Sequence, residues 1–368
     1  MKFICFSLGA SLSLIATAVT AGNLDRTRTP IDIIFEEGNY VELSFGYLEP
    51  SVTGRDAAGN ATGGVSNDFQ VTSVSGKLQF TNDISVSAIY DQPYGTDNVY
   101  GGDPVTTLLG GTIAQAETEA LTLLLAYDAT DSITVFGGPR IAGAQGRIAL
   151  SGLAYGPLNG YSVRFANDQG TGYVIGAAYQ IPEIAFRTAV TYHSGIDVDM
   201  RATETFPGGV PVVTGSTRTT LPQSLKLQIQ SGIAANTIAF GSIRWSDWSV
   251  FSLEPPSPAP ELADIDDAWT YELGVGYRFT DKFSASVTYV YEQEEGDNLV
   301  TPLAPTRGYQ SVSLGGKYQL SDAVSFSSGI QYIWIDNALL ETFPPNVVRG
   351  NFRDNDAVAI GFKLGVSF

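Results

Sequence analysis

Residues 357–368 read AVAIGFKLGVSF, and this stretch decides the fold class. Large apolar residues occupy every second position: Val358, Ile360, Phe362, Leu364, Val366 and Phe368. Between them stand small or polar residues, with Lys363 as the one charge. A strict period of two residues is typical of a β-strand whose two faces meet different surroundings.

The same alternation recurs in residues 267–279, 283–291 and 309–320. The second face of these segments is mainly Ser, Thr, Gly and Gln with isolated charges, which suits a closed polar interior better than bulk water. Aromatic residues stand near the segment ends, and such girdles are typical of outer-membrane barrels. The sequence therefore predicts an all-β fold, a transmembrane antiparallel up-and-down β-barrel.

Short and long connections alternate along the chain. Short turns rich in Asp, Asn, Pro and Thr lie near residues 81–83, 129–131, 181–183, 234–236, 280–281 and 321–322. Longer polar or Pro/Gly-rich loops lie near residues 51–68, 92–113, 151–160, 205–217, 249–266, 295–307 and 337–355. The pattern predicts fourteen strands, which start near residues 39, 69, 84, 114, 132, 161, 184, 215, 237, 267, 282, 307, 323 and 356. Gly137-Gly138-Pro139 and Gly170-Thr171-Gly172 interrupt two of them and predict bulges or bends. An even strand number, with short periplasmic turns and long extracellular loops, places both termini on the periplasmic side.

Composition excludes several classes of protein. The chain has 368 residues, and its 38 acidic against 20 basic residues give a formal net charge of −18. No nucleic-acid partner is expected, because a phosphate-binding surface needs clustered cations. Beyond the N-terminal stretch, no apolar run approaches the roughly 18 residues that a transmembrane helix needs. A closed barrel has no free edge at which to divide it, so residues 39–368 are expected to form one domain.

Two segments precede the predicted barrel. Residues 1–21 combine Lys2, a short apolar stretch and a small-residue end at Ala21, which is typical of a secretory signal peptide. The one cysteine, Cys5, lies there, so the mature chain is expected to have no disulfide and no thiolate metal site. Residues 22–38 form a short N-terminal segment whose apolar residues favour insertion as a lumen plug. A periplasmic tail or additional strand length is the alternative.

Three short motifs resemble the FadL/TodX family of outer-membrane transporters of long-chain fatty acids and aromatic hydrocarbons. Residues 89–95, IYDQPYG, are similar to that family's Pro-aromatic-Gly element after the third strand. Residues 221–225, LPQSL, and 244–249, RWSDWS, are similar to its Leu-Pro strand start and Trp-Ser strand end. The strand count, the loop sizes and the terminal Phe368 agree. The family's long N-terminal hatch is missing, because only the 17 residues 22–38 separate the predicted cleavage site from the first strand.

The resemblance implies passive uptake of a hydrophobic solute, captured by extracellular loops and released sideways through a gap in the barrel wall near the third strand. Pro93, Tyr94 and Gly95 are then candidates for the lateral opening, since Pro lacks the N–H that a strand ladder needs. Ile33 and Phe35 are gating candidates in the predicted plug. Apolar ligand-binding candidates in two loops are Val105, Leu108, Leu109, Ile113, Leu153, Tyr155 and Leu158.

Alternation also places six cations on the lumen side, because a charge facing lipid at the midplane costs about 2–4 kcal/mol. They are Lys77, Arg187, Lys226, Arg278, Lys317 and Lys363. Such cations either bind a fatty-acid carboxylate or pair with lumen acids such as Glu42, Glu272 and Glu292.

No enzymatic activity is expected. The one histidine, His193, stands next to Ser194, but adjacent strand residues point to opposite faces and cannot share a proton. No cofactor and no metal site are expected either. We expect a monomer in the outer membrane of a Gram-negative bacterium, in contact with membrane lipid and lipopolysaccharide, with a hydrophobic small molecule as ligand. A porin-like channel for small polar solutes and a structural barrel or adhesin are the alternatives.

Overall fold

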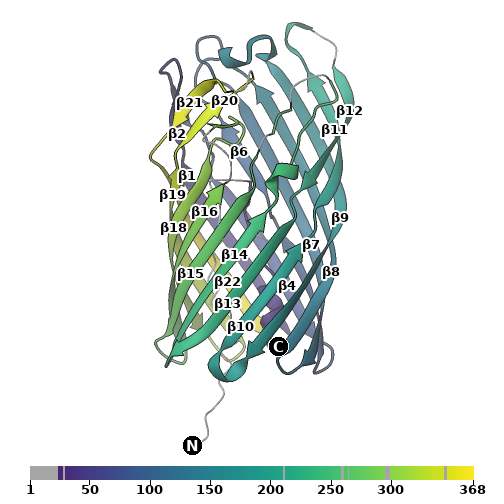
Figure 1. Cartoon of the computed structure of the whole chain (residues 1–368), viewed down its shortest axis with the longest axis vertical. Helices are drawn as coiled ribbons and strands as arrows, with labels where there is room; N and C mark the ends of the chain where they lie inside the picture. Colours follow the sequence, from purple (N-terminus) through teal and green to yellow (C-terminus); the bar gives the residue numbers. More distant parts are fainter. Residues whose placement is uncertain are drawn as a thin grey trace, which may run out of the picture.

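The computed structural model describes residues 24–27, 30–209, 212–257, 261–263, 265–294, 299–343 and 346–368. In this part of the chain the strands run obliquely around a tall barrel (Figure 1). Seventeen strand segments form one sheet, and three wall strands are each split into two segments: β5/β6, β10/β11 and β12/β13. The described wall therefore has fourteen strands, which confirms the prediction.

The wall strands are antiparallel to their neighbours. The pairing of β1 with β22, from Tyr40↔Ser367 to Ser51↔Asp356, closes the cylinder. In chain order the wall comprises β1 (Tyr40–Ser51), β4 (Phe69–Gln79), β5 (Ile84–Asp91), β6 (Gly95–Val99), β7 (Ile113–Thr130), β8 (Ile133–Leu150), β9 (Tyr161–Ile181), β10 (Phe186–His193), β11 (Ile196–Thr205), β12 (Val213–Leu221), β13 (Ser224–Ala234), β14 (Thr237–Ser246), β15 (Ala268–Arg278), β16 (Phe283–Glu294), β18 (Arg307–Gln319), β19 (Val324–Asp336) and β22 (Asn355–Ser367).

Side chains of the wall alternate between two environments, as β7 illustrates. Leu121, Leu123 and Leu125 are 41%, 43% and 55% exposed on the outer face. Thr122 and Leu124, which point inward between them, are 4% and 1% exposed. An exposed leucine surface around a closed barrel is the surface that lipid requires. Among the described residues, no helix is long and apolar enough to cross a membrane.

The two ends of the barrel differ. Short turns and the C-terminus lie at the lower end in Figure 1, and larger loops lie at the upper end. Part of the upper end is a second sheet in the order β17-β20-β21-β2-β3. Its strands are β2 (Thr53–Asp56), β3 (Ala61–Gly64), β17 (Leu299–Val300), β20 (Ala338–Glu341) and β21 (Val348–Phe352). Short 3-10 helices are η1 (Asp32–Phe35), η2 (Leu153–Leu158), η3 (Pro182–Ile184), η4 (Pro207–Gly209) and η5 (Trp248–Val250).

The glycine-rich stretches of β8 and β9 differ from the sequence interpretation. β9, with 21 residues, is the longest strand of the described wall, and β7 and β8 follow with 18 residues each. The pairing of β8 with β9 shifts register at Ala144/Gly146 instead of at the glycine interruptions. A Cβ on Gly138 would lie 2.0 Å from the Leu123 carbonyl oxygen, and one on Gly170 would lie 2.0 Å from that of Asp197. These glycines therefore permit close backbone approach rather than interrupting the strands.

Candidate functional site

The N-terminal segment packs against the inner face of the barrel. In η1, Ile33 and Ile34 are 3% and 5% exposed. They share an apolar cluster with the inward-facing side chains Leu124 and Phe136 of β7 and β8. Because these partners point into the barrel, η1 lies in the lumen.

Two of the predicted lumen cations contact this segment. Lys77 donates from Nζ to the carbonyl oxygens of Ile34 and Glu36, at 3.1 Å and 2.5 Å. The Arg187 Cζ lies 3.9 Å from the centroid of the Phe35 ring, which is a cation–π contact. Both cations therefore hold the segment in its place instead of facing an open channel.

Lys317 and Lys363 lie, like Lys77 and Arg187, close enough to interact with Glu36 of this segment, whereas Arg278 lies elsewhere. Lys363 Nζ lies 3.2 Å from Glu42 Oε2, and Arg278 donates to Asn236 Oδ1 at 2.8 Å beside a short turn. Lys226 and Lys317 are half-buried. The structure does not gather these six cations into one site.

The wall is interrupted after β5. The strand stops at Asp91 and resumes as β6 at Gly95, so that residues 92–94 leave the ladder. β4 pairs with β5 only over residues 74–79. Over residues 69–73, β4 has β1 on one side and, among the described residues, no paired strand on the other. The side chain of Gln92 reaches across, where its Oε1 accepts a bond from the Thr72 N–H at 2.9 Å.

Residues 24–27 cover this interruption. The Gly95 N–H donates to the Leu24 carbonyl at 2.8 Å, and the Arg26 N–H donates to the Pro93 carbonyl at 2.6 Å. Thr27 Oγ1 donates to Asp91 Oδ2 at 2.6 Å. The segment thus supplies backbone partners that the wall itself lacks at this point.

Side chains of the same residues fix the segment to both sides of the lumen. Asp25 and Arg244 of β14 form an ion pair at 2.5 Å, with side chains 1% and 2% exposed. The Arg26 Cζ lies 4.3 Å from the Phe69 ring centroid. A Cβ on Gly95 would lie 2.5 Å from that same carbon and 2.8 Å from the Ala116 carbonyl oxygen, so the backbone at this point leaves room for glycine but not for a side chain. Burial lowers the pKa of the Arg26 guanidinium, an effect that Glu117 and Asp97 oppose.

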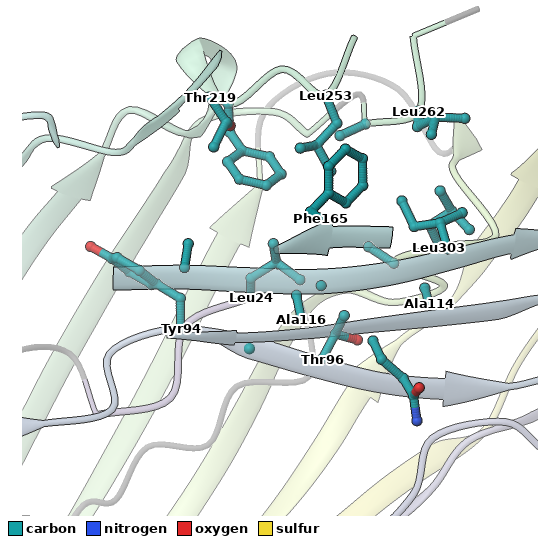
Figure 2. Close-up of a pocket in the computed structure, with 18 of the residues that line it drawn as sticks. Leu24, Tyr94, Thr96, Ala114, Ala116, Phe165, Thr219, Leu253, Leu262 and Leu303 are labelled. Atoms are coloured by element: carbon teal, nitrogen blue, oxygen red, sulfur yellow. The ribbon is translucent and has the colours of Figure 1, made fainter. Parts of the chain in front are cut away.

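An apolar pocket lies beside the covered interruption. It has an empty volume of about 740 Å³, part of which is open to solvent. Figure 2 shows Leu24, Tyr94, Phe165 and Leu303 reaching it from different parts of the chain. Other apolar lining residues are Ala114, Ala116, Ala144, Ile148, Met200, Leu221, Trp248, Phe251, Leu253, Leu262, Ala263 and Ile265.

Aromatic rings shape one side of this pocket. Trp248 is fully buried, and its ring meets Tyr94 and Phe251 edge to face, with centroid distances of 5.1 Å and 5.8 Å. These packed pairs fix the ring positions before any ligand enters.

Only some of the candidate residues predicted from the sequence lie at the pocket. Tyr94 and Gly95 line the pocket, and Pro93 lies in the interruption beside it. The seven loop candidates are not among the lining residues. Val105 and Leu153 are 70% and 51% exposed, and Leu109 is 1% exposed in a separate apolar cluster. Leu108, Ile113, Tyr155 and Leu158 are half-buried.

Sequence reasoning missed most of the pocket. One signal was present: inward positions that carry large apolar residues, such as Phe165 in β9 and Met200 in β11, break the rule of a polar lumen. Within the described ranges, no group of three or more His, Cys, Asp and Glu side chains is arranged to hold a metal ion.

Comparisons with known proteins agree with this geometry. A family model described as "Outer membrane protein transport protein (OMPP1/FadL/TodX)" matches residues 10–367. The fold is similar to a Pseudomonas aeruginosa FadL homologue, with 15% identity, a TM-score of 0.73 and 92% of each chain covered. It is also similar to the Pseudomonas putida toluene transporter TodX, with 14% identity, a TM-score of 0.68 and 92% of each chain covered. The Ralstonia pickettii toluene transporter TbuX gives 15% identity, a TM-score of 0.61 and 90% of each chain. At these identities the structures establish the fold alone. No curated protein sequence gave a significant match.

Proposed function

Because the chain belongs to the OMPP1/FadL/TodX family of outer membrane transport proteins, we propose that it carries hydrophobic small molecules passively across the outer membrane. One observation supports this most directly: an apolar pocket lies in the barrel, next to the interruption in the wall. The family consists of transport proteins, in agreement with the expectation that the chain is not an enzyme.

The route that we propose begins at the extracellular loops, passes through the pocket and ends in the bilayer. Tyr94 and Gly95 support the last step, since they line the pocket and also border the interruption of the wall. Release into lipid keeps an apolar solute out of water, and burial of apolar surface is favourable by roughly 25 cal/mol per Å². The exposed loop residues Val105 and Leu153 are suited to the first contact with such a solute.

Residues 22–38 act as the plug in this scheme. Residues 22, 23, 28 and 29 lie outside the described residues. The rest of the segment supports the proposal through its buried isoleucines and through the backbone bonds of residues 24–26 with the wall. Ile33 and Phe35 keep their proposed gating role as part of this segment. The solute leaves when residues 24–27 withdraw from the interruption.

The two alternative functions are less well supported. A porin-like channel needs a continuous aqueous lumen, whereas η1 and residues 24–27 occupy the lumen beside several strands. A structural barrel or adhesin has no need for an apolar pocket beside a wall interruption.

The protein is an outer-membrane barrel, and we propose further that both termini are periplasmic. Short turns at the end that carries the C-terminus favour this orientation (Figure 1). We also propose that the barrel is a monomer whose outer leucine surface and loops contact membrane lipid and lipopolysaccharide.

The transport proposal is tested by blocking the pocket. Ala116→Trp fills it from β7, whereas Leu123→Trp places the same side chain on the lipid face of the same strand. In bacteria that produce the protein, we expect Ala116→Trp to abolish the added uptake of radiolabelled naphthalene and Leu123→Trp to leave it unchanged. Heat-modified gel mobility checks that both barrels fold. Sugar-driven swelling of proteoliposomes, without any naphthalene uptake by the unchanged protein, would favour the porin instead.

A further inference from the structure

We propose that the pocket accepts uncharged hydrophobic molecules and excludes those with an ionised carboxylate. The inference rests on the proposed function and deepens it, because a barrel of this kind could serve either class of solute. The chemistry of the described lining distinguishes between the two.

The lining provides no available cation. Of its described residues, Arg147 alone carries a charge, and this side chain is exposed on the outer face of β8. Arg244 lies in contact with Asp25, which already neutralises it at 2.5 Å. Arg26 lies at the wall interruption, where its guanidinium packs between Phe69 and Gly95. Arg140 of β8 is buried near Tyr94, but it is not among the lining residues. Within the lining itself, a carboxylate would therefore have no cationic partner.

The loop above the pocket carries negative charge. Leu262, Ala263 and Ile265 of this loop line the pocket. The charged residues that the structure describes between positions 249 and 267 are all acidic: Glu254, Glu261, Asp266 and Asp267. Like charges disfavour the ionised form of an acid. The acidic loop thus repels ligands with an ionised carboxylate, for which the lining offers no cation.

The shape of the lining favours a flat apolar ligand. Trp248 and Phe251 meet edge to face, and the Met200 side chain from β11 is part of the same cluster and lining. Ring edges and a thioether are favourable partners for an aromatic hydrocarbon. Small residues on β7 and β8, such as Ala116 and Gly146, leave room for such a ring.

Two ligands with the same ring system measure this selectivity. Naphthalene and 2-naphthoate differ by one carboxylate, and equilibrium dialysis of each radiolabelled compound against purified protein at pH 8 gives its affinity. The blocked variant Ala116→Trp serves as the blank, because it removes pocket binding and retains partition into detergent. An ionised group without a partner is costly to bury, so we expect naphthalene to bind at least about tenfold more tightly.

A second variant tests the reason for the selectivity. Thr219 lies on the inner side of β12, is 2% exposed and lines the pocket. Thr219→Arg supplies the missing cation and should raise the affinity for 2-naphthoate by roughly tenfold or more. Thr219→Val keeps the shape without the charge and should not change it.

Each outcome decides a different point. Equal or tighter binding of 2-naphthoate to the unchanged protein overturns the selectivity and leaves the transport proposal intact. No saturable difference from Ala116→Trp with either compound overturns the pocket as the ligand site. In that case the uptake assay with the same variant decides separately whether hydrophobic transport fails as well.

Discussion

At the scale of single residues, the ion pair of Asp25 and Arg244 constrains the N-terminal segment most strongly. Both side chains are almost wholly buried, and removal of one partner from a buried pair typically costs about 3–5 kcal/mol. This cost acts on the docked state of residues 24–27, because β1 and β22 close the wall without them. We expect Asp25→Asn to free the segment and to raise the conductance of the protein in planar lipid bilayers.

A matched control exists in the same barrel. Asp199 and Arg218 form an ion pair at 2.9 Å, but both side chains are more than half exposed to the surroundings. Exposed pairs are weak, so Asp199→Asn should leave the conductance unchanged. Equal effects of the two variants would mean that the buried pair does not hold the segment.

At the scale of elements, Asp56 at the end of β2 ties together two loops at the end of the barrel opposite the short turns. Its carboxylate accepts the N–H groups of Ala58 at 3.0 Å, Asn60 at 2.8 Å and Leu108 at 2.9 Å, and a side-chain bond from Asn60 at 3.0 Å. Burial alone raises the pKa of Asp56, but the bonds from Leu108, Asn60 and Ala58 outweigh it and hold the pKa below its ordinary value.

A depressed carboxyl pKa predicts loosening of these loops in acid. The stabilisation is complete well above the unfolded pKa of about 3.9 and is lost as the pH falls through the lower folded value. Amide hydrogen exchange of residues 53–64 and 101–112 should therefore show protection at pH 7 that declines below about pH 4. Asp56→Asn should lower the protection at pH 7 and remove most of its pH dependence. Asp131→Asn, in an exposed short turn, is the control, and an unaltered profile in Asp56→Asn would contradict this role.

The elements also show how far the sequence alone could lead. Strand starts and the closed barrel could be predicted because lipid outside and a different interior impose alternation on each strand separately. The second sheet, at the upper end of the barrel, could not be predicted. Its strands β2 and β21 are far apart in sequence, and neither short strand is regular enough to be recognised. The pocket combines Leu24, Phe165 and Trp248, and no local pattern relates three residues on different elements. A break in the strand near Pro93 could be predicted from the sequence because a missing N–H is a local feature, and the role of Pro93 in a lateral opening stays a prediction.

At the scale of the whole molecule, the direction of transport depends on which end of the barrel faces the cell exterior. The short turns share one end with the C-terminus, and an exported chain that inserts from the periplasm keeps its short turns there. The one cysteine of the chain is Cys5, so single cysteines introduced elsewhere, in a chain that carries Cys5→Ser, can report the orientation.

Two exposed positions at opposite ends are suitable for this measurement. Val105→Cys lies in the loop between β6 and β7, and Asn82→Cys lies in the short turn between β4 and β5. In intact cells, a membrane-impermeant maleimide should label Val105→Cys and leave Asn82→Cys unlabelled until the outer membrane is permeabilised. The reverse labelling result would mean that the short turns face the cell exterior and the long loops face the periplasm. The acidic loop of residues 249–267 would then lie on the periplasmic side, and its charge would act on solutes that leave the cell instead of on those that enter it.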